Sequence, residues 1–421
     1  MSTVLVVGGG GREHALSPRG VGVLVGPGNA GTAREDRCHN VEADPRDIDA
    51  MVDLARREQA ALVVVGPEAP LVAGLVDALQ GAGIAAFGPG AAAAELEGSK
   101  VHAKEFMARH GVPTAAAAWF SDAGDALRHL DGLTEVPVVK ASGLAAGKGV
   151  IVPDDFGSAA SAIREMLLES RFGPAGSRVV LEERLTGTEV SILAFCDGAT
   201  FEVMPAAQDH KRLLAGDEGP NTGGMGAFVP SPAADDELVE RIGREVLAPT
   251  LHGLAEEGRP YRGVLYAGMM LTADGPKVIE YNCRFGDPET QVVLPLLLTD
   301  PLEVLEACAT STLAGITVEW SDQAAVAVVM ASEGYPERAA SPSPIRGLDA
   351  AAGLGCTVFH AGTRVIGGEV HASGGRVLAV SALGPDLTAA AELAHAGVAE
   401  ISFVGARHRA DIARPRVVRT R

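Results

Sequence analysis

The sequence predicts a protein of mixed α/β and α+β class whose first domain is a doubly wound parallel sheet. Short apolar strands alternate with helical stretches near the N-terminus, which is typical of a parallel sheet covered by helices. The 421 residues exceed the usual size of one domain, so two to four domains are expected. Only 4% of the residues are aromatic, and small apolar side chains of this kind let helices pack closely on a sheet.

The first domain is expected to cover residues 1–98 and to end near the Ala-rich run Ala91–Ala94. Strands are predicted at Val4–Val7, Val21–Val25 and Leu62–Val65, followed by a helix at about Leu71–Gln80.

A second region begins with a predicted helix at Ser99–Arg109, for which Ser99 is the expected N-cap. Strands are predicted at Val136–Lys140, Val179–Glu183 and Val190–Ala194, helices at Ala159–Leu168 and Leu238–Ala255 (interrupted by Pro249), and a hairpin from Gly263–Leu271 and Lys277–Asn282. The last region is expected from about Asp322, with strands at Ala324–Met330 and Arg376–Ala382 and a helix at Asp386–His395.

Charge and cysteine content exclude some classes of protein. The formal net charge of −19 argues against a non-specific nucleic-acid binder, although a few Arg, Lys and backbone N–H groups still suffice for small anions. The five cysteines are scattered and form no C-x-x-C pair, so we expect no disulfide framework or zinc site and a reducing, cytoplasmic location. No apolar run is long enough for a signal peptide or a membrane span, so no membrane partner is expected.

The first glycine-rich loop, Gly8–Gly11, follows a predicted strand, as a phosphate-binding turn does. The third glycine of a dinucleotide fingerprint is missing, because Glu13 occupies its position, and no acidic residue ends the second strand. Backbone N–H groups of Gly10 and Gly11, together with the guanidinium of Arg12, are suited to a small phosphate. A tight turn without a ligand explains this loop equally well.

The second glycine-rich loop, Gly143–Gly149, lacks the spacing of a P-loop, since Ser142 stands where the first glycine is required and Gly149 follows Lys148. Taken alone, the loop is best explained as a mobile surface hairpin. With Lys140 eight residues away and an acidic strand downstream, we favour a flap that folds over a triphosphate.

The acidic strand is Lys277–Asn282, in which Glu280 and Asn282 point to the same side. Carboxylate and amide oxygens side by side are suited to Mg²⁺ on nucleotide phosphates, whereas a solvent-facing polar edge is the alternative. The following turn contains Arg284, Asp287 and Glu289, and this density of charge favours catalysis. Glu182, Glu183 and Glu189 form a further charged turn, which taken alone is weak support for an adenine and ribose site.

Together these segments resemble the phosphoribosylamine–glycine ligase family of ATP-grasp enzymes along the whole chain. The matching stretches are Gly10–His14, Pro27–Thr32, Val65–Leu71, Glu97–Lys100, Gly143–Gly149, Gln208–Arg212, Gly219–Gly226 and Asn282–Gln291, of which the last is very specific. Between His14 and Pro27 the chain is several residues shorter than in the family, so the first helix is expected to be very short.

The resemblance implies a pre-ATP-grasp domain (1–98), a two-lobed ATP-grasp module (99–320, with a mobile lid at about 119–190) and a small C-terminal α+β domain (321–421). It implies that ATP, glycine and 5-phosphoribosylamine give glycinamide ribonucleotide, ADP and phosphate, in a monomer that uses Mg²⁺ or Mn²⁺. The implied roles are metal ligands for Glu280 and Asn282; ATP binding for Lys100, Lys140, Lys148, Glu182, Glu183 and Glu189; substrate binding for Gly10, Gly11, Arg12, Glu13, Asp209, Asn221, Thr222 and Arg284; and catalysis for Arg284, Lys148 and Asp287.

Three alternatives remain from the residues. Another ATP-grasp ligase or carboxylase would share the nucleotide and metal sites but would use formate or bicarbonate. A dinucleotide-dependent oxidoreductase would depend on the first glycine-rich loop. A non-catalytic nucleotide-binding regulator would bind ATP without glycine-dependent release of ADP.

Overall fold

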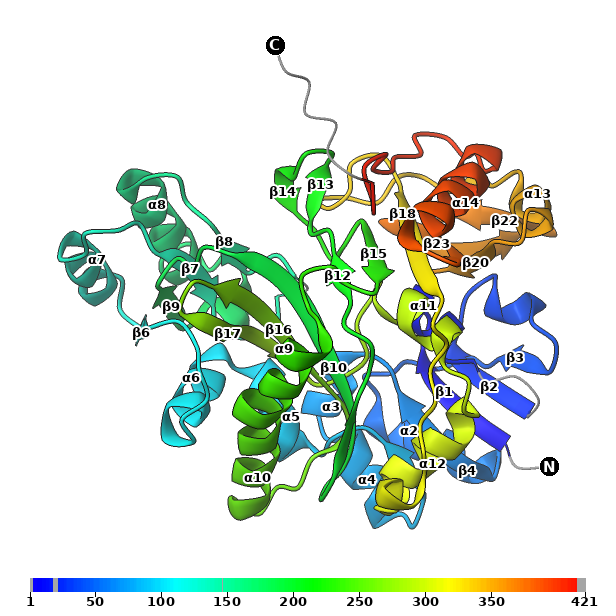
Figure 1. The fold of residues 1–421 in the computed structure, drawn as a ribbon, viewed down its shortest axis with the longest axis horizontal. Coiled ribbons are helices and arrows are strands. Elements are labelled where there is room, and N and C mark those ends of the chain that lie inside the picture. The colour runs from blue at the N-terminus through cyan, green and yellow to red at the C-terminus, as the bar shows by residue number, and fades with distance from the viewer. Residues whose placement is uncertain (1–2, 18–21, 146, 415–421) are drawn as a thin grey trace.

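The N-terminal sheet is fully parallel, as predicted, with the strand order β3-β2-β1-β4-β5. The computed structural model describes residues 3–17, 22–145 and 147–414, so Val21 and Ala146 lie outside the described residues (Figure 1). The strands are β1 (Thr3–Gly8), β2 (Gly22–Pro27), β3 (Cys38–Asn40), β4 (Ala60–Val65) and β5 (Ala86–Phe87), and the helices are α1 (Gly11–Ala15), α2 (Ile48–Arg57), α3 (Glu68–Val72), α4 (Leu75–Gly81) and α5 (Ala91–Gly98). Helix α1 has only five residues, so the prediction of a very short first helix is confirmed.

One prediction about this region is wrong. The single helix expected at Leu71–Gln80 is two helices, because Gly74 adopts a φ of +91° and this left-handed conformation breaks the helical path. The run Ala91–Ala94, near which the first domain is predicted to end, begins α5, which is consistent with the high helix propensity of alanine.

The residues of the predicted lid form a separate lobe, called the lid lobe below, and its antiparallel sheet β6-β9-β7-β8 is called the lid sheet. Figure 1 shows this lobe projecting from the rest of the molecule with α7 and α8 on its sheet. Its elements are β6 (Ala117–Phe120), α7 (Ala123–Asp131), β7 (Val138–Ala141), β8 (Val150–Ile151), α8 (Phe156–Leu167) and β9 (Val179–Glu182). Both helices begin at an aspartate whose side chain accepts a backbone N–H of the first turn, Asp122 for α7 and Asp155 for α8. The lobe has its own core, which includes Leu130, Val139 and Ile163.

The central sheet is antiparallel, in the order β11-β10-β16-β17. Its strands are β10 (Thr188–Asp197), β11 (Phe201–Val203), β16 (Arg262–Thr272) and β17 (Gly275–Asn282), and the helices around it are α6 (Lys100–Arg109), α9 (Asp236–Ile242), α10 (Ala248–Glu256), α11 (Thr290–Val293) and α12 (Pro301–Thr310). The predicted β16–β17 hairpin is confirmed. So is the Ser99 cap, whose hydroxyl accepts the His102 N–H at 3.2 Å. The interruption near Pro249 is a π-helical turn at Gly243–Leu247 that joins α9 to α10.

The third large sheet, called the C-terminal sheet below, has the order β12-β15-β18-β23-β20. Its strands are β12 (Gln208–Asp209), β15 (Gly226–Val229), β18 (Ala324–Ala331), β20 (Thr357–His360) and β23 (Arg376–Gly384). Smaller elements nearby are β13 (Arg212–Leu214), β14 (Glu218–Asn221), β19 (Ser343–Pro344), β21 (Thr363–Ile366), β22 (Glu369–Ala372), α13 (Leu348–Gly353) and α14 (Leu387–Glu400). This sheet therefore joins strands from both sides of residue 321. No helix in the described part of the chain has the length and apolarity needed to cross a bilayer.

The N-terminal and C-terminal regions meet around His360, at the end of β20. Its backbone N–H donates to Nδ1 of His14 at 2.8 Å, and its carbonyl accepts from Asn29 Nδ2 at 2.8 Å. His360 is 5% exposed. Burial, with smaller effects from His14 and Arg34, lowers the pKa of His360 from 6.5 to about 3, against an opposing effect of Glu35. The folded protein therefore keeps this histidine neutral.

We expect His360→Asn to flatten the dependence of stability on pH. Below pH 6.5 the unfolded chain protonates this histidine and the folded chain does not, so stability falls as the pH drops from 6.5 towards 3. The slope from one such group is about 1.4 kcal/mol per pH unit. Denaturant unfolding at pH 7 and pH 5 should show a loss that is about 2 kcal/mol smaller in the variant. Equal losses in both proteins would contradict the neutral, buried imidazole.

Candidate functional site

A cavity of about 1260 Å³ lies where the lid sheet, the central sheet, the first glycine-rich loop and the C-terminal sheet meet. Most of the predicted site residues line it: Gly10, Arg12, Glu13, Lys100, Lys140, Glu182, Glu183, Glu189, Asp209, Asn221, Thr222, Glu280, Asn282, Arg284 and Asp287. Gly11 and Lys148 do not. Gly11 is buried as the first residue of α1, and Lys148 is exposed on the hairpin after β7.

Strand β17 brings Glu280 and Asn282 to the same side of the central sheet, where both line the cavity. The Oδ1 atom of Asn282 accepts from Arg284 Nη2 at 3.1 Å, which fixes the orientation of the amide. The described residues include no cluster of three or more His, Cys, Asp or Glu side chains with metal-binding geometry. A divalent metal on this pair of oxygens would thus take further ligands from water or from a bound phosphate.

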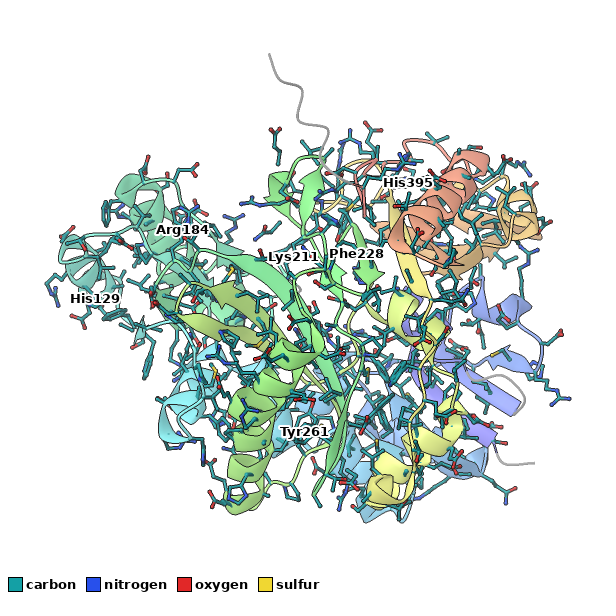
Figure 2. All side chains as sticks on the ribbon, in the orientation of Figure 1. His129, Arg184, Lys211, Phe228, Tyr261 and His395 are labelled. Atoms are coloured by element: carbon teal, nitrogen blue, oxygen red, sulfur yellow. The ribbon has the colours of Figure 1, made fainter. Side chains whose placement is uncertain are left out.

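Three lysines act electrostatically on the carboxyl group of Glu280. Burial alone would raise the pKa of this carboxyl, but Lys211, Lys100 and Lys140 outweigh that effect and lower it. Figure 2 shows Lys211 near the centre of the molecule, between the lid lobe and the C-terminal sheet. The site therefore combines an ionised carboxylate with several cations, an arrangement that suits a metal-bound polyphosphate.

Lys211 also lies close to Asp209 and Glu189, with its Nζ 3.7 Å and 3.3 Å from their respective carboxylate oxygens. Burial raises the pKa of Asp209 to about 7, in spite of Lys211. The pKa of Lys211 is well above its ordinary value, because the attraction of Asp209 and other acids outweighs burial. Lys211 belongs to the stretch Gln208–Arg212, which matches the family, but no local pattern in the sequence indicates its place in the site.

Glu182, at the end of β9, is buried between two lysines, Lys104 and Lys140, and forms an ion pair with each. The next residue, Glu183, accepts the backbone N–H of Ala116 at 3.1 Å. Glu182 and Glu183 thus lie where the sheet β6-β9-β7-β8 joins the rest of the chain. Lys104 could not be predicted as a site residue from the sequence, because no local sequence pattern distinguishes it from any other lysine on a helix.

The turn after β17 fixes Arg284 among carboxylates. Its Nη2 donates to Glu97 Oε1 at 2.9 Å, its Nε lies 3.5 Å from Glu68 Oε2, and its Nη1 donates to the Phe285 carbonyl at 3.2 Å. Burial would lower the pKa of Arg284, but the effect of Glu97 and Glu68 is larger and raises this pKa above its ordinary value. Burial raises the pKa of Glu97, although Arg284 opposes this. Arg284 is therefore a fixed positive charge at the wall of the cavity.

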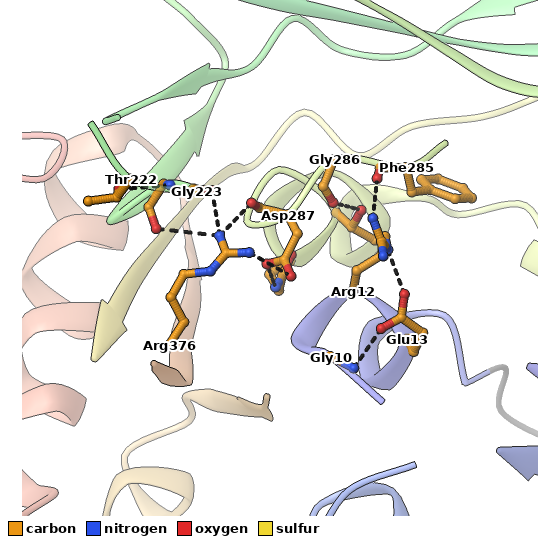
Figure 3. A network of polar contacts seen from close by, with 12 residues as sticks. Gly10, Arg12, Glu13, Thr222, Gly223, Phe285, Gly286, Asp287 and Arg376 are labelled. Atoms are coloured by element: carbon orange, nitrogen blue, oxygen red, sulfur yellow. Dashed lines mark hydrogen bonds and ion pairs between the residues drawn. The ribbon is translucent and has the colours of Figure 1, made fainter. Parts of the chain in front are cut away.

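The first glycine-rich loop is closed by its own glutamate, as Figure 3 shows. Glu13 Oε2 accepts the Gly10 N–H at 2.6 Å, and Glu13 Oε1 accepts from Arg12 Nε at 2.6 Å. Arg12 Nη1 also donates to the Phe285 carbonyl at 3.2 Å. Glu13 thus connects the backbone of the loop to Arg12, and Arg12 connects the loop to the Arg284–Asp287 turn.

Asp287 and Arg376 connect that turn to the C-terminal region (Figure 3). Arg376 Nη2 lies 3.1 Å from Asp287 Oδ2, and its Nη1 donates to the Gly223 carbonyl beside Thr222. Burial would raise the pKa of Asp287, but Arg376 and Arg12 lower it. Arg376 belongs to the site but had no local signal in the sequence beyond its place at the start of a predicted strand.

The comparisons with known proteins cover nearly the whole chain. Models of phosphoribosylglycinamide synthetase match its N domain to residues 2–97, its ATP-grasp (A) domain to 98–290 and its C domain to 325–415. The chain is 49% identical over 425 residues to the phosphoribosylamine–glycine ligase of Allochromatium vinosum, with 99% of each chain covered. It is 51% identical over 417 residues to the trifunctional purine biosynthetic protein adenosine-3 of Gallus gallus, covering 97% of this chain and 42% of that protein.

Solved structures agree. The crystal structure of phosphoribosylamine–glycine ligase from Thermotoga maritima superposes with a TM-score of 0.84 at 32% identity, covering 97% of this chain and 100% of that one. A biotin carboxylase domain from Hydrogenobacter thermophilus matches with a TM-score of 0.72 at 17% identity, covering 97% and 91%, and therefore shows the fold alone. The predicted family and the predicted ATP-grasp fold class are both confirmed, and the chain belongs to the phosphoribosylglycinamide synthetase family.

Proposed function

We propose that this chain is an ATP-dependent ligase that joins glycine to 5-phosphoribosylamine and gives glycinamide ribonucleotide, ADP and phosphate. The observation that carries the proposal is that one cavity contains both the Glu280–Asn282 pair with its lysines and the Arg284–Asp287 turn with its link to Arg12. Relatives named phosphoribosylamine–glycine ligase that match over their full length support the same reaction.

ATP is proposed to bind along Lys100, Lys140, Lys148, Glu182, Glu183 and Glu189, all of which except Lys148 line the cavity. Lys148 is assigned to the hairpin that covers the phosphates when the lid lobe closes. The hard oxygen donors of Glu280 and Asn282 fit Mg²⁺ or Mn²⁺. A divalent ion held by these two residues would neutralise negative charge on the phosphates.

The reaction is proposed to run in two steps without a covalent bond to the enzyme. A glycine carboxylate oxygen bonds to the γ-phosphorus, the bond from that phosphorus to ADP breaks, and glycyl phosphate forms. The amine of phosphoribosylamine then bonds to the acyl carbon, phosphate leaves with the carboxylate oxygen, and the amine loses a proton. Arg284, fixed by Glu97, is suited to hold the carboxylate and the acyl phosphate. Lys148 is assigned to excluding water and Asp287 to positioning the turn.

The amine substrate is proposed to bind at Gly10, Gly11, Arg12, Glu13, Asp209, Asn221 and Thr222. The ion pair of Arg12 with Glu13 supports a positioning role for Glu13, since it orients the guanidinium. We further propose the domain division 1–98, 99–320 and 321–421 with a lid at about 119–190, which the separate lid core supports. A monomer in the cytoplasm is proposed, and the five free, buried cysteines are compatible with a reducing compartment.

Glycine labelled with ¹⁸O in both carboxylate oxygens tests the reaction. Each phosphate released should carry a single ¹⁸O, because the oxygen that attacks the γ-phosphorus leaves with the phosphate, and the product amide should keep the other. Mass spectrometry of phosphate and product measures both. Product that forms with unlabelled phosphate would contradict the acyl phosphate. Turnover with bicarbonate or formate in place of glycine would move the chain to another ATP-grasp reaction.

A further inference from the structure

Lys104 is a buried lysine on α6 whose ammonium group lies at the wall of the cavity. Its Nζ donates to Thr114 Oγ1 at 2.7 Å and to the Ala115 carbonyl at 3.0 Å, and it forms an ion pair with Glu182. The residue is only 7% exposed. A buried ammonium with three oxygen partners has a fixed position, so Lys104 in turn fixes the position of the groups that it contacts.

What Lys104 holds is the carboxylate of Glu182, which also forms an ion pair with Lys140. Strands β7 and β9 pair so that Lys140 lies opposite Val180, and Lys140 and Glu182 therefore share one face of the lid sheet. Lys140 Nζ also donates to the Ile279 carbonyl of β17 at 3.3 Å. Two lysines and one glutamate leave a net positive charge beside the strand that carries Glu280.

Thr114 connects Lys104 to the same strand. Its hydroxyl donates to the Val278 carbonyl at 2.6 Å, so it accepts the hydrogen bond from Lys104. The Val278 N–H in turn donates to the Pro113 carbonyl at 2.8 Å. Lys104 is thus bonded to the lid sheet through Glu182 and to β17 through Thr114, which makes it a link between the two lobes.

We propose that Lys104 is a positioning residue of the nucleotide site, which holds Glu182 so that Lys140 projects towards the phosphates next to Glu280. The inference rests on the nucleotide half of the proposed function, and it assigns no role in the chemistry to Lys104. Without Lys104, the Glu182 carboxylate pairs with Lys140 alone. The Lys140 ammonium is then neutralised and drawn away from the position in which it would contact the nucleotide.

The test is direct binding of MgADP, measured by calorimetry on the full chain. Lys104→Met should weaken binding at least about tenfold, a factor that corresponds to one lost charge-assisted contact. In turnover, KM for ATP should rise while KM for glycine stays unchanged. Thr114→Val, which removes the other anchor with little change in shape, should shift MgADP binding in the same direction by a smaller factor, and it serves if Lys104→Met fails to fold.

Glu182→Gln separates positioning from simple charge. If only net charge mattered, this variant would bind MgADP more tightly, because the cluster becomes more positive. Positioning predicts weaker binding, and the Lys104→Met/Glu182→Gln double variant should bind no worse than the weaker single variant. The matched control is Arg109→Met on the same helix, whose exposed guanidinium pairs with Glu257 outside the cavity and whose loss should leave MgADP binding unchanged.

Wild-type affinity for MgADP in Lys104→Met would overturn the inference, as would tighter binding by Glu182→Gln. An equal loss of glycine and ATP affinity would do the same, because it would indicate a general structural defect. If the unmodified chain binds MgADP but makes no glycinamide ribonucleotide, the proposed reaction fails while the inference on Lys104 stands.

Discussion

Glu280→Ala is expected to lower kcat at saturating MgATP by about 1000-fold while leaving the protein folded. The carboxylate lies on β17 with three lysines around it, so it is the ionised oxygen donor in the part of the cavity assigned to the phosphates. Its removal takes away the proposed metal ligand and leaves the lysines without this nearby negative charge. Product formation measures the loss, and thermal unfolding checks the fold.

Glu369→Ala is the matched control, because Glu369 is an exposed strand carboxylate on β22 outside the cavity. It should keep wild-type activity. Full activity of Glu280→Ala at high Mg²⁺ or Mn²⁺ concentrations would contradict the assignment of the metal ligand. A loss of activity that is matched by unfolding would make Glu280 a structural residue.

Arg284→Met is expected to abolish activity and to lower the unfolding free energy by about 3 kcal/mol at neutral pH. The variant leaves Glu97 buried without its cation, although the Cys283 N–H still donates to Glu97 Oε2 at 2.7 Å. Because burial already raises the pKa of Glu97, its folded pKa lies above the unfolded value. The folded state then takes up a proton first, so the variant should lose most stability at neutral pH and regain part of it near pH 5.

The double variant Arg284→Met/Glu97→Gln distinguishes the two roles of the arginine. Removing the stranded carboxylate should restore most of the lost stability and none of the activity, since the fixed cation is still absent. Recovery of activity in the double variant would contradict a role for Arg284 at the reacting groups. A stability deficit that does not change with pH would contradict the buried ionised Glu97.

Local patterns were enough to predict much of the fold. The apolar strand Val4–Val7, the Ser99 cap and the β16–β17 hairpin each follow from short stretches of sequence, and each is found in the structure. The helix at Leu71–Gln80 was wrong because a single glycine, Gly74, takes a left-handed conformation that its apolar neighbours do not indicate.

The sheets were harder to predict than the elements. Strand β15 pairs with β18 from about a hundred residues further along the chain, and no local pattern predicts such pairing. The same distinction between local and long-range information applies to the residues of the site. Glu280 and Asn282 follow from strand periodicity, whereas Lys104 and Arg376 belong to the site only through partners that are distant in the sequence.

ADP release from MgATP, with glycine and freshly generated phosphoribosylamine added singly and together, tests the central claim most directly. We expect release only when both are present, together with an equal amount of glycinamide ribonucleotide. Release with neither substrate, or no release despite bound ATP, would contradict the assignment of this cavity as the site of the ligase reaction.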